Sequence, residues 1–284
     1  MPLRARRRRI RALWVLGILI LCAGLFYGVS WASYLPQYNV SDISISGAKD
    51  MKEEVIKRSL ESVLDDGSYH VLSRRNIFLY PQANLEKVLV DSFPLIKSAR
   101  VTRPSMLATT IVVEIEERQP FARWCTHDDA RCYFMDEGGF VYTPVPESAG
   151  TSTPQTMPGT LYVFKGDVDS SADSTGSPQA SPVGQWFVQA HLPGLLSLLK
   201  FLGQGGFTVL GAEVDGQDIV VHLKEGFLLK ASFGADANML AKNLELVLSS
   251  DVLKGKTGSL EYVDLRFGNR VYYKLEGQSE VSAE

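Results

Sequence analysis

ALWVLGILILCAGLFYGVSWASY, residues 12–34, is a run of 23 residues without a formal charge. A helix rises about 1.5 Å per residue, so this run would be roughly 34 Å long and could cross the hydrocarbon core of a bilayer. Trp14 lies near one end of the run, and Trp31 and Tyr34 lie near the other, where interfacial aromatic residues are common. The run therefore predicts a transmembrane helix that anchors the chain in the lipid bilayer.

The charge on either side of this run predicts its orientation. Residues 1–11 hold no acidic residue and six arginines: Arg4, Arg6, Arg7, Arg8, Arg9 and Arg11. Only Lys49 and Lys52 are basic in the twenty residues that follow the run. By the positive-inside rule, residues 1–11 form a cytoplasmic tail and residues 35–284 are exported. A nucleic-acid-binding tail is the weaker interpretation of the arginines, because they stand directly before a spanning segment.

A cleaved signal peptide is the alternative interpretation of the same run. Ser30-Trp31-Ala32 offers small residues at the spacing that a signal peptidase needs. The apolar stretch is nevertheless longer than the h-region of a signal peptide, which has about 7–15 residues. We therefore expect an uncleaved anchor.

Composition places the rest of the chain among folded, acidic proteins. Hydrophobic residues make up 45% and charged residues 21%, which are values typical of globular proteins. The net charge is −3, and the chain without the six N-terminal arginines holds 23 basic and 32 acidic residues. An acidic body of this kind argues against binding to nucleic acid.

The apolar pattern predicts a first folded piece, an α+β unit over residues 40–117. Strands are expected at residues 43–45, 96–103 and 110–117, and helices at residues 51–64 and from Pro81 to Phe93-Pro94. Asp50 is the expected N-cap of the first of these helices. The order of elements is then β-α-α-β-β.

A second, β-rich piece is predicted over residues 118–276. Its strands are expected at residues 121–124, 133–135, 140–142, 161–165, 207–214, 219–224, 227–233, 260–267 and 270–275. Helices are expected at residues 185–202, with an interruption at Pro193-Gly194, and at residues 236–248. Residues 167–184 contain 13 Asp, Ser, Thr, Gly or Pro out of 18, which indicates a flexible surface insertion. Residues 277–284 are expected to be a C-terminal tail.

The three cysteines suggest no metal site. Cys22 lies in the middle of the apolar run and is expected to be a small apolar residue in the membrane. Cys125 and Cys132 flank a short polar segment, and in a hairpin they would face each other at disulfide distance. Two free, half-buried thiols are an equally good interpretation. A metal site that also used His127 would lack a fourth ligand at a familiar spacing.

Motifs that would indicate an enzyme are missing from the sequence. It contains no H-E-x-x-H and no G-x-S-x-G motif, and its four histidines are scattered. Gly255-Lys256-Thr257 resembles the end of a phosphate-binding loop, but Ser250 stands where the first glycine is required. We therefore expect no catalytic residue, no cofactor, no metal and no small-molecule substrate. The remaining interpretation is a membrane-anchored, exported binding protein.

Four short motifs resemble those of a known family in order and spacing. They are Ile43-Ser44-Ile45-Ser46-Gly47, the ERQPFARW stretch at residues 117–124, the DEGGFV stretch at residues 136–141 and the YVDLRF stretch at residues 262–267. The chain resembles the FtsQ/DivIB family of bacterial cell-division proteins over nearly its whole length. The motifs are similar to that family's opening POTRA strand, E-R-x-P-x-A-x-W junction, D-x-x-G-x-V turn and C-terminal strand. The chain departs from the family at Ala108, where a proline is usual.

The resemblance implies a non-catalytic scaffold of the divisome. Residues 40–117 would be a POTRA-type domain linked with recruitment to the division site. Residues 118–276 would be the β domain that binds exported parts of bitopic FtsB/FtsL-like proteins, by pairing its last strand with a strand of the partner. The protein would cross the cell (inner) membrane once, concentrate at the septum and help to place the septal wall synthase.

The last predicted hairpin is the candidate partner-binding site, because a final strand often forms a sheet edge with unpaired backbone groups. Its candidate residues are Tyr262, Asp264, Arg266, Arg270, Val271, Tyr272, Tyr273 and Lys274. Counting back from the Gly268-Asn269 turn pairs Arg270 with Phe267, Tyr272 with Leu265 and Tyr273 with Asp264.

Two alternatives stay open within this hairpin. Tyr272 and Tyr273 point to opposite faces, so one can pack on the domain while the other meets a partner. Both could instead pack as ordinary sheet aromatics. Asp264 and Arg266 lie two residues apart on one face and could form an internal pair rather than a partner contact.

Three other functions are alternatives to a division scaffold. An exported POTRA protein of a transport or envelope-assembly system would fit the first piece, but the exported length leaves no room for the membrane barrel that normally follows. An exported enzyme with an unfamiliar site is a second alternative. A wall-binding protein is a third, although the sequence shows no glycan groove lined with aromatic residues.

Overall fold

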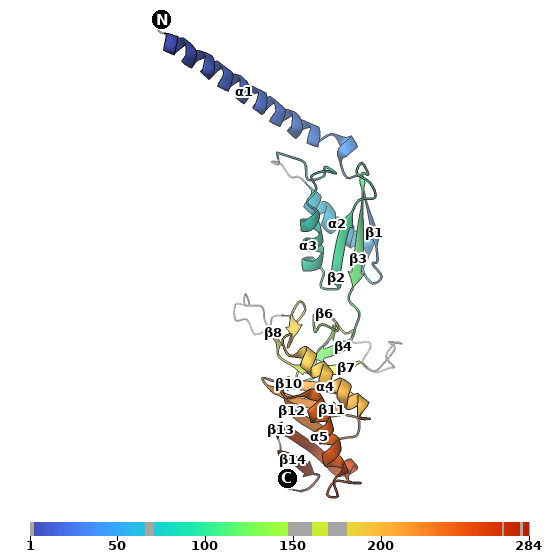
Figure 1. The fold of residues 1–284 in the computed structure, drawn as a ribbon. Coiled ribbons are helices and arrows are strands. Elements are labelled where there is room, and N and C mark those ends of the chain that lie inside the picture. The colour runs from blue at the N-terminus through green and yellow to red at the C-terminus, as the bar shows by residue number, and fades with distance from the viewer. Residues whose placement is uncertain are drawn as a thin grey trace. The chain divides into compact units, whose positions relative to one another are not determined.

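The computed structural model describes residues 3–65, 71–146, 161–169, 181–268, 270–278 and 281–283 (Figure 1). It has an α+β fold with an N-terminal apolar helix and a large mixed β-sheet, which confirms the α+β class of the prediction. The chain divides into two compact units, Met1–Glu117 and Arg118–Glu284.

The first unit begins with the long helix α1 (Leu3–Ser33). Its segment Arg11–Ser33 is long and apolar enough to cross a membrane, as the charge-free run predicts. The large apolar side chains of this segment are exposed, which in water would be unfavourable and in lipid is expected. All six arginines that the sequence marks as topology determinants belong to α1 or precede its apolar segment. A short 3-10 helix, η1 (Pro36–Tyr38), follows α1.

A three-stranded sheet and two helices complete the first unit. The elements are β1 (Asp42–Ser46), α2 (Glu53–Leu64), α3 (Gln82–Ser92), β2 (Ile96–Thr102) and β3 (Thr110–Glu117). The central strand β3 pairs in parallel with β1 and antiparallel with β2. Buried residues from the helices, such as Ile56, Leu60 and Leu85, share one core with Ile111 and Val113 of β3.

The start of α2 differs from the prediction. Lys52, not Asp50, is its N-cap residue, and no side chain of the cap makes a hydrogen bond. The buried carboxylate of Glu117, at the end of β3, instead accepts hydrogen bonds from the backbone N–H groups of Lys49, Asp50 and Met51 at 2.9–3.2 Å. The prediction was wrong because the stabilising carboxylate comes from a strand that is distant in sequence.

The second unit is built on a ten-stranded sheet. Its strand order is β15-β14-β13-β12-β11-β10-β7-β4-β5-β6. The strands are β4 (Ala122–Cys125), β5 (Cys132–Met135), β6 (Val141–Pro144), β7 (Tyr162–Gly166), β10 (Val209–Asp215), β11 (Asp218–Leu223), β12 (Leu228–Ser232), β13 (Leu260–Phe267), β14 (Arg270–Leu275) and β15 (Val281–Ala283).

Two helices, α4 (Leu192–Gln204) and α5 (Ala237–Ser249), pack on this sheet next to each other (Figure 1). Ile219, Val221 and Leu223 of β11 are buried in the same core as the inner faces of the helices. The intervening residues of β11 are only half-buried. This alternation means that the helices cover one face of the sheet and leave the other more open.

Two predictions in this unit need correction. The helix expected over residues 185–202 begins only at Leu192, because Pro193 stands in its first turn, where proline starts a helix rather than interrupting one. Residues before it form β9 (Trp186–Phe187), which pairs with β8 (Val168–Asp169). The predicted insertion 167–184 therefore contributes β8 to the fold at its first end, while its residues 170–180 lie outside the described residues.

Candidate functional site

The candidate site is the C-terminal hairpin formed by β13 and β14. The two strands pair antiparallel, with Phe267 opposite Arg270, as predicted. Further along, Asp264 faces Tyr272 and Val263 faces Tyr273, so the predicted register is wrong by one residue there. The pairing shifts between Asp264 and Phe267. A bulge of this kind places two residues of one strand opposite a single residue of the other.

The bulge has a local cause in the side chain of Asp264. One of its carboxylate oxygens accepts a hydrogen bond from the backbone N–H of Arg266 at 3.1 Å. A short polar side chain that bonds the backbone two residues later competes with regular strand pairing. The sequence places Asp264 and Arg266 on one face, but it does not reveal that the pair would distort the strand.

The side chains of Asp264 and Arg266 form an internal ion pair. The guanidinium Nε of Arg266 lies 3.0 Å from Oδ1 and its Nη2 lies 2.7 Å from Oδ2 of Asp264, which is buried. Arg266 also pairs with Asp218 on β11. Hydrogen bonds to Asp264 and Asp218 raise the pKa of Arg266. The pairing supports the alternative in which these residues hold the sheet together rather than contact a partner.

The two tyrosines of β14 lie in different environments. Tyr273 is 6% exposed and belongs to the core of the second unit, as does Val271. Tyr272 is half-buried, and its ring meets the ring of Phe267 edge-on with centroids 5.1 Å apart. Phe267 itself is 54% exposed. Tyr272 and Phe267 thus form an accessible aromatic pair at the end of the hairpin.

The remaining candidate residues lie on accessible parts of the hairpin. Tyr262 of β13 carries the ammonium of Lys230 over its ring, 3.7 Å from the centroid. Lys274 pairs with Glu261 across the two strands at 2.7 Å. Arg270 is exposed at the start of β14. These contacts link neighbouring strands on the accessible side of the hairpin, and the side chains that make them stay partly exposed.

The outer side of β14 is occupied, which contradicts the prediction of a free final edge. Residues 277–284 were expected to be a tail, and β14 the final edge. The structure instead pairs β15 antiparallel with β14, joining Val271 to Ala283, Tyr272 to Ser282 and Tyr273 to Val281. Gly277 has a positive φ of 74°, which lets the chain reverse tightly after β14. An unpaired strand edge attracts the nearest segment able to pair with it, and here that segment is the C-terminus.

The opposite end of the sheet is also covered. The backbone N–H of Val141 in β6 donates to the carbonyl of Gln185 at 2.9 Å, and the N–H of Gly184 donates to the carbonyl of Val141 at 2.8 Å. Pro144, which has no N–H, ends β6. Among the described residues, β15 is the shortest strand of the large sheet, and it lies at the other end of the strand order.

Two of the motif stretches meet inside the second unit. Arg118 forms a buried ion pair with Asp136, and its guanidinium lies 3.8 Å from the centroid of the Phe140 ring. Asp136 also accepts hydrogen bonds from the N–H groups of Gly138 and Phe140 at 2.9 Å. The charged residues of the junction and of the turn therefore hold the fold, a role that sequence spacing alone did not indicate.

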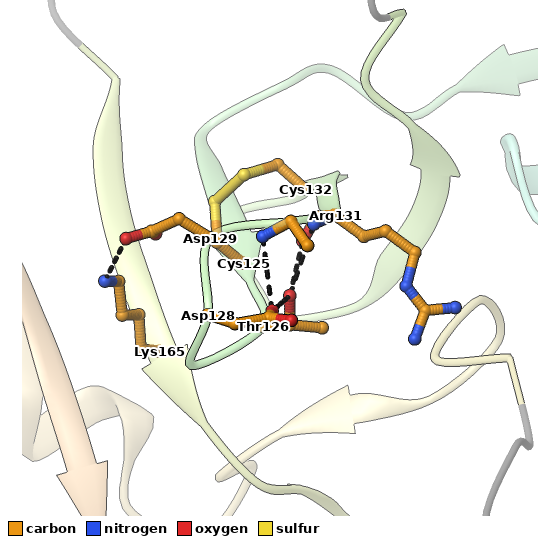
Figure 2. Close-up of a disulfide and its surroundings, with 8 residues drawn as sticks. Cys125, Thr126, Asp128, Asp129, Arg131, Cys132 and Lys165 are labelled. Carbon is orange, nitrogen blue, oxygen red and sulfur yellow. Dashed lines mark hydrogen bonds and ion pairs between the residues drawn. A yellow bond between two sulfur atoms is a disulfide. The ribbon is translucent and has the colours of Figure 1, made fainter.

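Cys125 and Cys132 form a disulfide (Figure 2). They face each other as the last residue pair of the β4–β5 hairpin. In the loop between them, Asp129 forms an ion pair with Lys165 of β7 at 2.6 Å. Of the two interpretations that the sequence left open, the structure contains the disulfide rather than two free thiols.

Replacing Cys125 and Cys132 together by serine should destabilise the second unit by about 2 kcal/mol, because the disulfide closes a short loop and restricts the unfolded chain modestly. Urea unfolding of the full chain in detergent measures this loss. A Cys22→Ser variant serves as control and should unfold like the parent. Partner binding should persist in the folded double variant, since β4 and β14 are separated by five other strands of the sheet. An unchanged unfolding midpoint would contradict a stabilising role for the bond.

Chemistry-bearing side chains do not converge elsewhere in the described part of the chain. Within it, no group of three or more His, Cys, Asp or Glu side chains could hold a metal ion. His127 pairs with Glu213 at 3.0 Å, and His191 stacks on Phe233 with ring centroids 4.6 Å apart. The C-terminal hairpin thus stays the candidate site. No protein-family model matches this sequence, and no curated protein is significantly similar to it.

Proposed function

We propose that this chain is a membrane-anchored scaffold of bacterial cell division, of the kind found in the FtsQ/DivIB family. Its exported part binds the exported parts of small bitopic FtsB/FtsL-like proteins and so helps to localise septal wall synthesis. Three features support the proposal: one helix in the described part of the chain that is able to span a membrane, a following unit with the order β-α-α-β-β that the family resemblance implies, and a large β unit. The N-terminus is cytoplasmic in this proposal, and both folded units lie outside.

The observation that carries the proposal is the β14 end of the large sheet. β14 has six residues, and within the described part of the chain β15 pairs with three of them, Val271 to Tyr273. A longer strand from a partner could pair with all six and would gain more backbone hydrogen bonds, each worth about 0.5–1.5 kcal/mol. The partner strand therefore takes the place of β15, by strand exchange rather than by addition to a free edge.

Side chains at this edge supply specificity, because backbone hydrogen bonds do not distinguish one strand from another. The accessible pair of Tyr272 and Phe267 offers an aromatic anchor, and aromatic residues are enriched among the residues that dominate binding energy. The buried pair of Asp264 and Arg266 fixes the bulge beside it. Tyr273 and Val271 anchor β14 to the core and keep the edge in place during exchange.

Site-specific crosslinking in dividing cells tests this function. A photoreactive amino acid at position 272 should crosslink to a small bitopic membrane protein. It should not crosslink to helix α1 of the same chain. Position 246 is the matched control, because Leu246 is 68% exposed and belongs to helix α5 rather than to a strand of the sheet. Crosslinks of equal yield from both positions, or none from position 272 in cells that are dividing, would contradict the proposal.

A further inference from the structure

Two loops of the first unit carry exposed apolar side chains next to the end of α1. In the segment 71–80, four apolar residues are 37–53% exposed: Val71, Leu72, Phe78 and Leu79. In the segment 103–109, which joins β2 to β3, Met106 and Leu107 are 78% and 70% exposed. Exposed apolar residues that gather in this way indicate an interaction surface rather than ordinary surface variation.

Hydrogen bonds tie the first loop to the last turn of the membrane helix. The hydroxyl of Ser30 donates to the carbonyl oxygen of Val71. The backbone N–H of Ser73 donates to the hydroxyl of Ser33 at 3.1 Å, and the side-chain amide of Asn76 donates to the carbonyl of Ser33 at 3.0 Å. Ser33, Ser73 and Asn76 are all buried, so this junction is packed and the loop is held at the end of α1.

The chain that leaves α1 is bonded to the same loop. The N–H of Ile77 donates to the carbonyl of Tyr38 at 2.8 Å, and the N–H of Val40 donates to the carbonyl of Arg75 at 2.7 Å. Ser41, one residue later, donates its N–H to the carbonyl of Thr109 at 2.8 Å, which brings in the second loop. Both loops therefore lie at the end of the unit where α1 enters it.

Arg103 joins the two loops. Its guanidinium lies 5.7 Å from the ring centroid of Phe78 and 5.6 Å from that of Tyr80, and it donates to the carbonyl of Met106 at 2.8 Å. The rings of Phe78 and Tyr38 are also neighbours, with centroids 6.2 Å apart. The exposed apolar residues therefore belong to one connected surface.

The position of this surface relative to α1 sets its depth in a bilayer. Ser30 lies three residues before the end of α1, or about 4.5 Å back along the helix axis. The apolar segment is about 34 Å long, and the hydrocarbon core is about 30 Å thick, so Ser30 lies near the boundary between hydrocarbon and headgroups. The carbonyl of Val71, which bonds to Ser30, must then lie at the same boundary.

The charges on the loops fit the same location. Segments 71–80 and 103–109 contain three arginines, Arg74, Arg75 and Arg103, and no acidic residue. Exposed apolar residues interspersed with arginines and aromatic rings are typical of segments that lie in a membrane interface. Anionic headgroups attract such arginines.

We propose that segments 71–80 and 103–109 form a second membrane contact, in which their apolar side chains enter the headgroup boundary of the exported leaflet and their arginines meet anionic lipid headgroups. This contact holds the first unit against the bilayer instead of leaving it on a free linker. The proposal depends on α1 crossing the membrane, and it does not depend on any division partner.

Fluorescence quenching in reconstituted bilayers tests the proposal with the full chain and lipid alone. In a Cys22→Ala background, a single cysteine at Leu72 or at Met106 carries an environment-sensitive dye. Nanodiscs contain phosphatidylcholine and phosphatidylglycerol, with or without a lipid that carries a quenching spin label near the headgroup. Both dyes should lose emission to this lipid, and the loss should shrink when phosphatidylglycerol is left out.

Val55→Cys is the matched control within the same unit. Val55 is 42% exposed in the first turn of α2, at the end of the unit where Glu117 closes β3, away from Thr109. A dye there should not be quenched. Quenching at Leu72 no stronger than at Val55 would overturn the membrane contact. Equal quenching at Met106 and Val55 would show that segment 103–109 is not part of the contact.

A cysteine at Leu19, in the middle of α1, tests separately whether α1 crosses the membrane. A dye there should be quenched by a lipid that is spin-labelled deep in its acyl chain. Quenching at Leu19 without quenching at Leu72 leaves the anchor intact and overturns the second contact alone. Absence of quenching at Leu19 overturns the anchor and the contact together.

Discussion

Ending the chain after Gln278, which removes β15, should raise its affinity for the exported part of an FtsB/FtsL-like partner. The three residue pairs that β15 makes with β14 have to be broken before a partner strand can pair there. Two or three backbone hydrogen bonds at about 0.5–1.5 kcal/mol each amount to about 1–4 kcal/mol. Affinity should therefore rise roughly five- to several hundred-fold.

Binding titrations with the full chain and the shortened chain, both in nanodiscs, measure this change. The kinetics give a second readout, because removing a competitor strand should speed association while leaving dissociation nearly unchanged. The shortened chain should stay folded, because the core around Val271 and Tyr273 is kept, but it should lose up to the same 1–4 kcal/mol of unfolding free energy. A loss of affinity on shortening would show that the partner pairs with β15 itself, and an unchanged affinity would place the contact elsewhere.

A longer truncation, which ends the chain after Phe267, is a poor test of strand exchange at β14. It removes Val271 and Tyr273, which are 7% and 6% exposed and belong to the core of the second unit. Loss of large buried side chains costs several kcal/mol, so lost binding would then report unfolding rather than the absence of an edge. The informative truncation site is therefore the end of β14 and not the turn of the hairpin.

Periodicity and turn residues were enough to predict most strands of the fold. Strands at residues 110–117, 260–267 and 270–275 were predicted with the bounds that the structure shows. Each combines alternating or β-branched residues with a clear turn or chain break at its ends, and these signals are local in sequence. The long apolar helix α1 was predicted for the same reason, because length and lack of charge are properties of a single segment.

Contacts between distant segments could not be predicted in this way. The carboxylate of Glu117 stabilises the entry to α2, and Arg266 pairs with Asp218, across gaps of more than forty residues. The shifted register near Asp264 depends on a side-chain bond to the backbone, and β15 depends on an edge that exists only after the sheet has formed. Such features follow from the assembled structure rather than from the pattern of any one segment.

Replacing Tyr272 by alanine should weaken partner binding by about 2 kcal/mol or more, roughly thirtyfold, if the accessible pair of Tyr272 and Phe267 is the anchor. Stability should change little, because Tyr272 is half-buried and lies outside the core. Tyr273→Ala is the matched comparison: it empties a buried site and should cost about 3–5 kcal/mol of unfolding free energy.

The two neighbouring tyrosines thus separate binding from folding on a single strand. Binding titrations and urea unfolding of the same full-chain variants give both quantities, and Tyr272→Phe should bind nearly as well as the parent, since it keeps the ring that meets Phe267. If Tyr272→Ala binds normally while Tyr273→Ala is unstable, the hairpin is only a structural part of the sheet. The alternative that both tyrosines are ordinary sheet aromatics would then be correct, and strand exchange at β14 would have to rely on backbone pairing without an aromatic anchor.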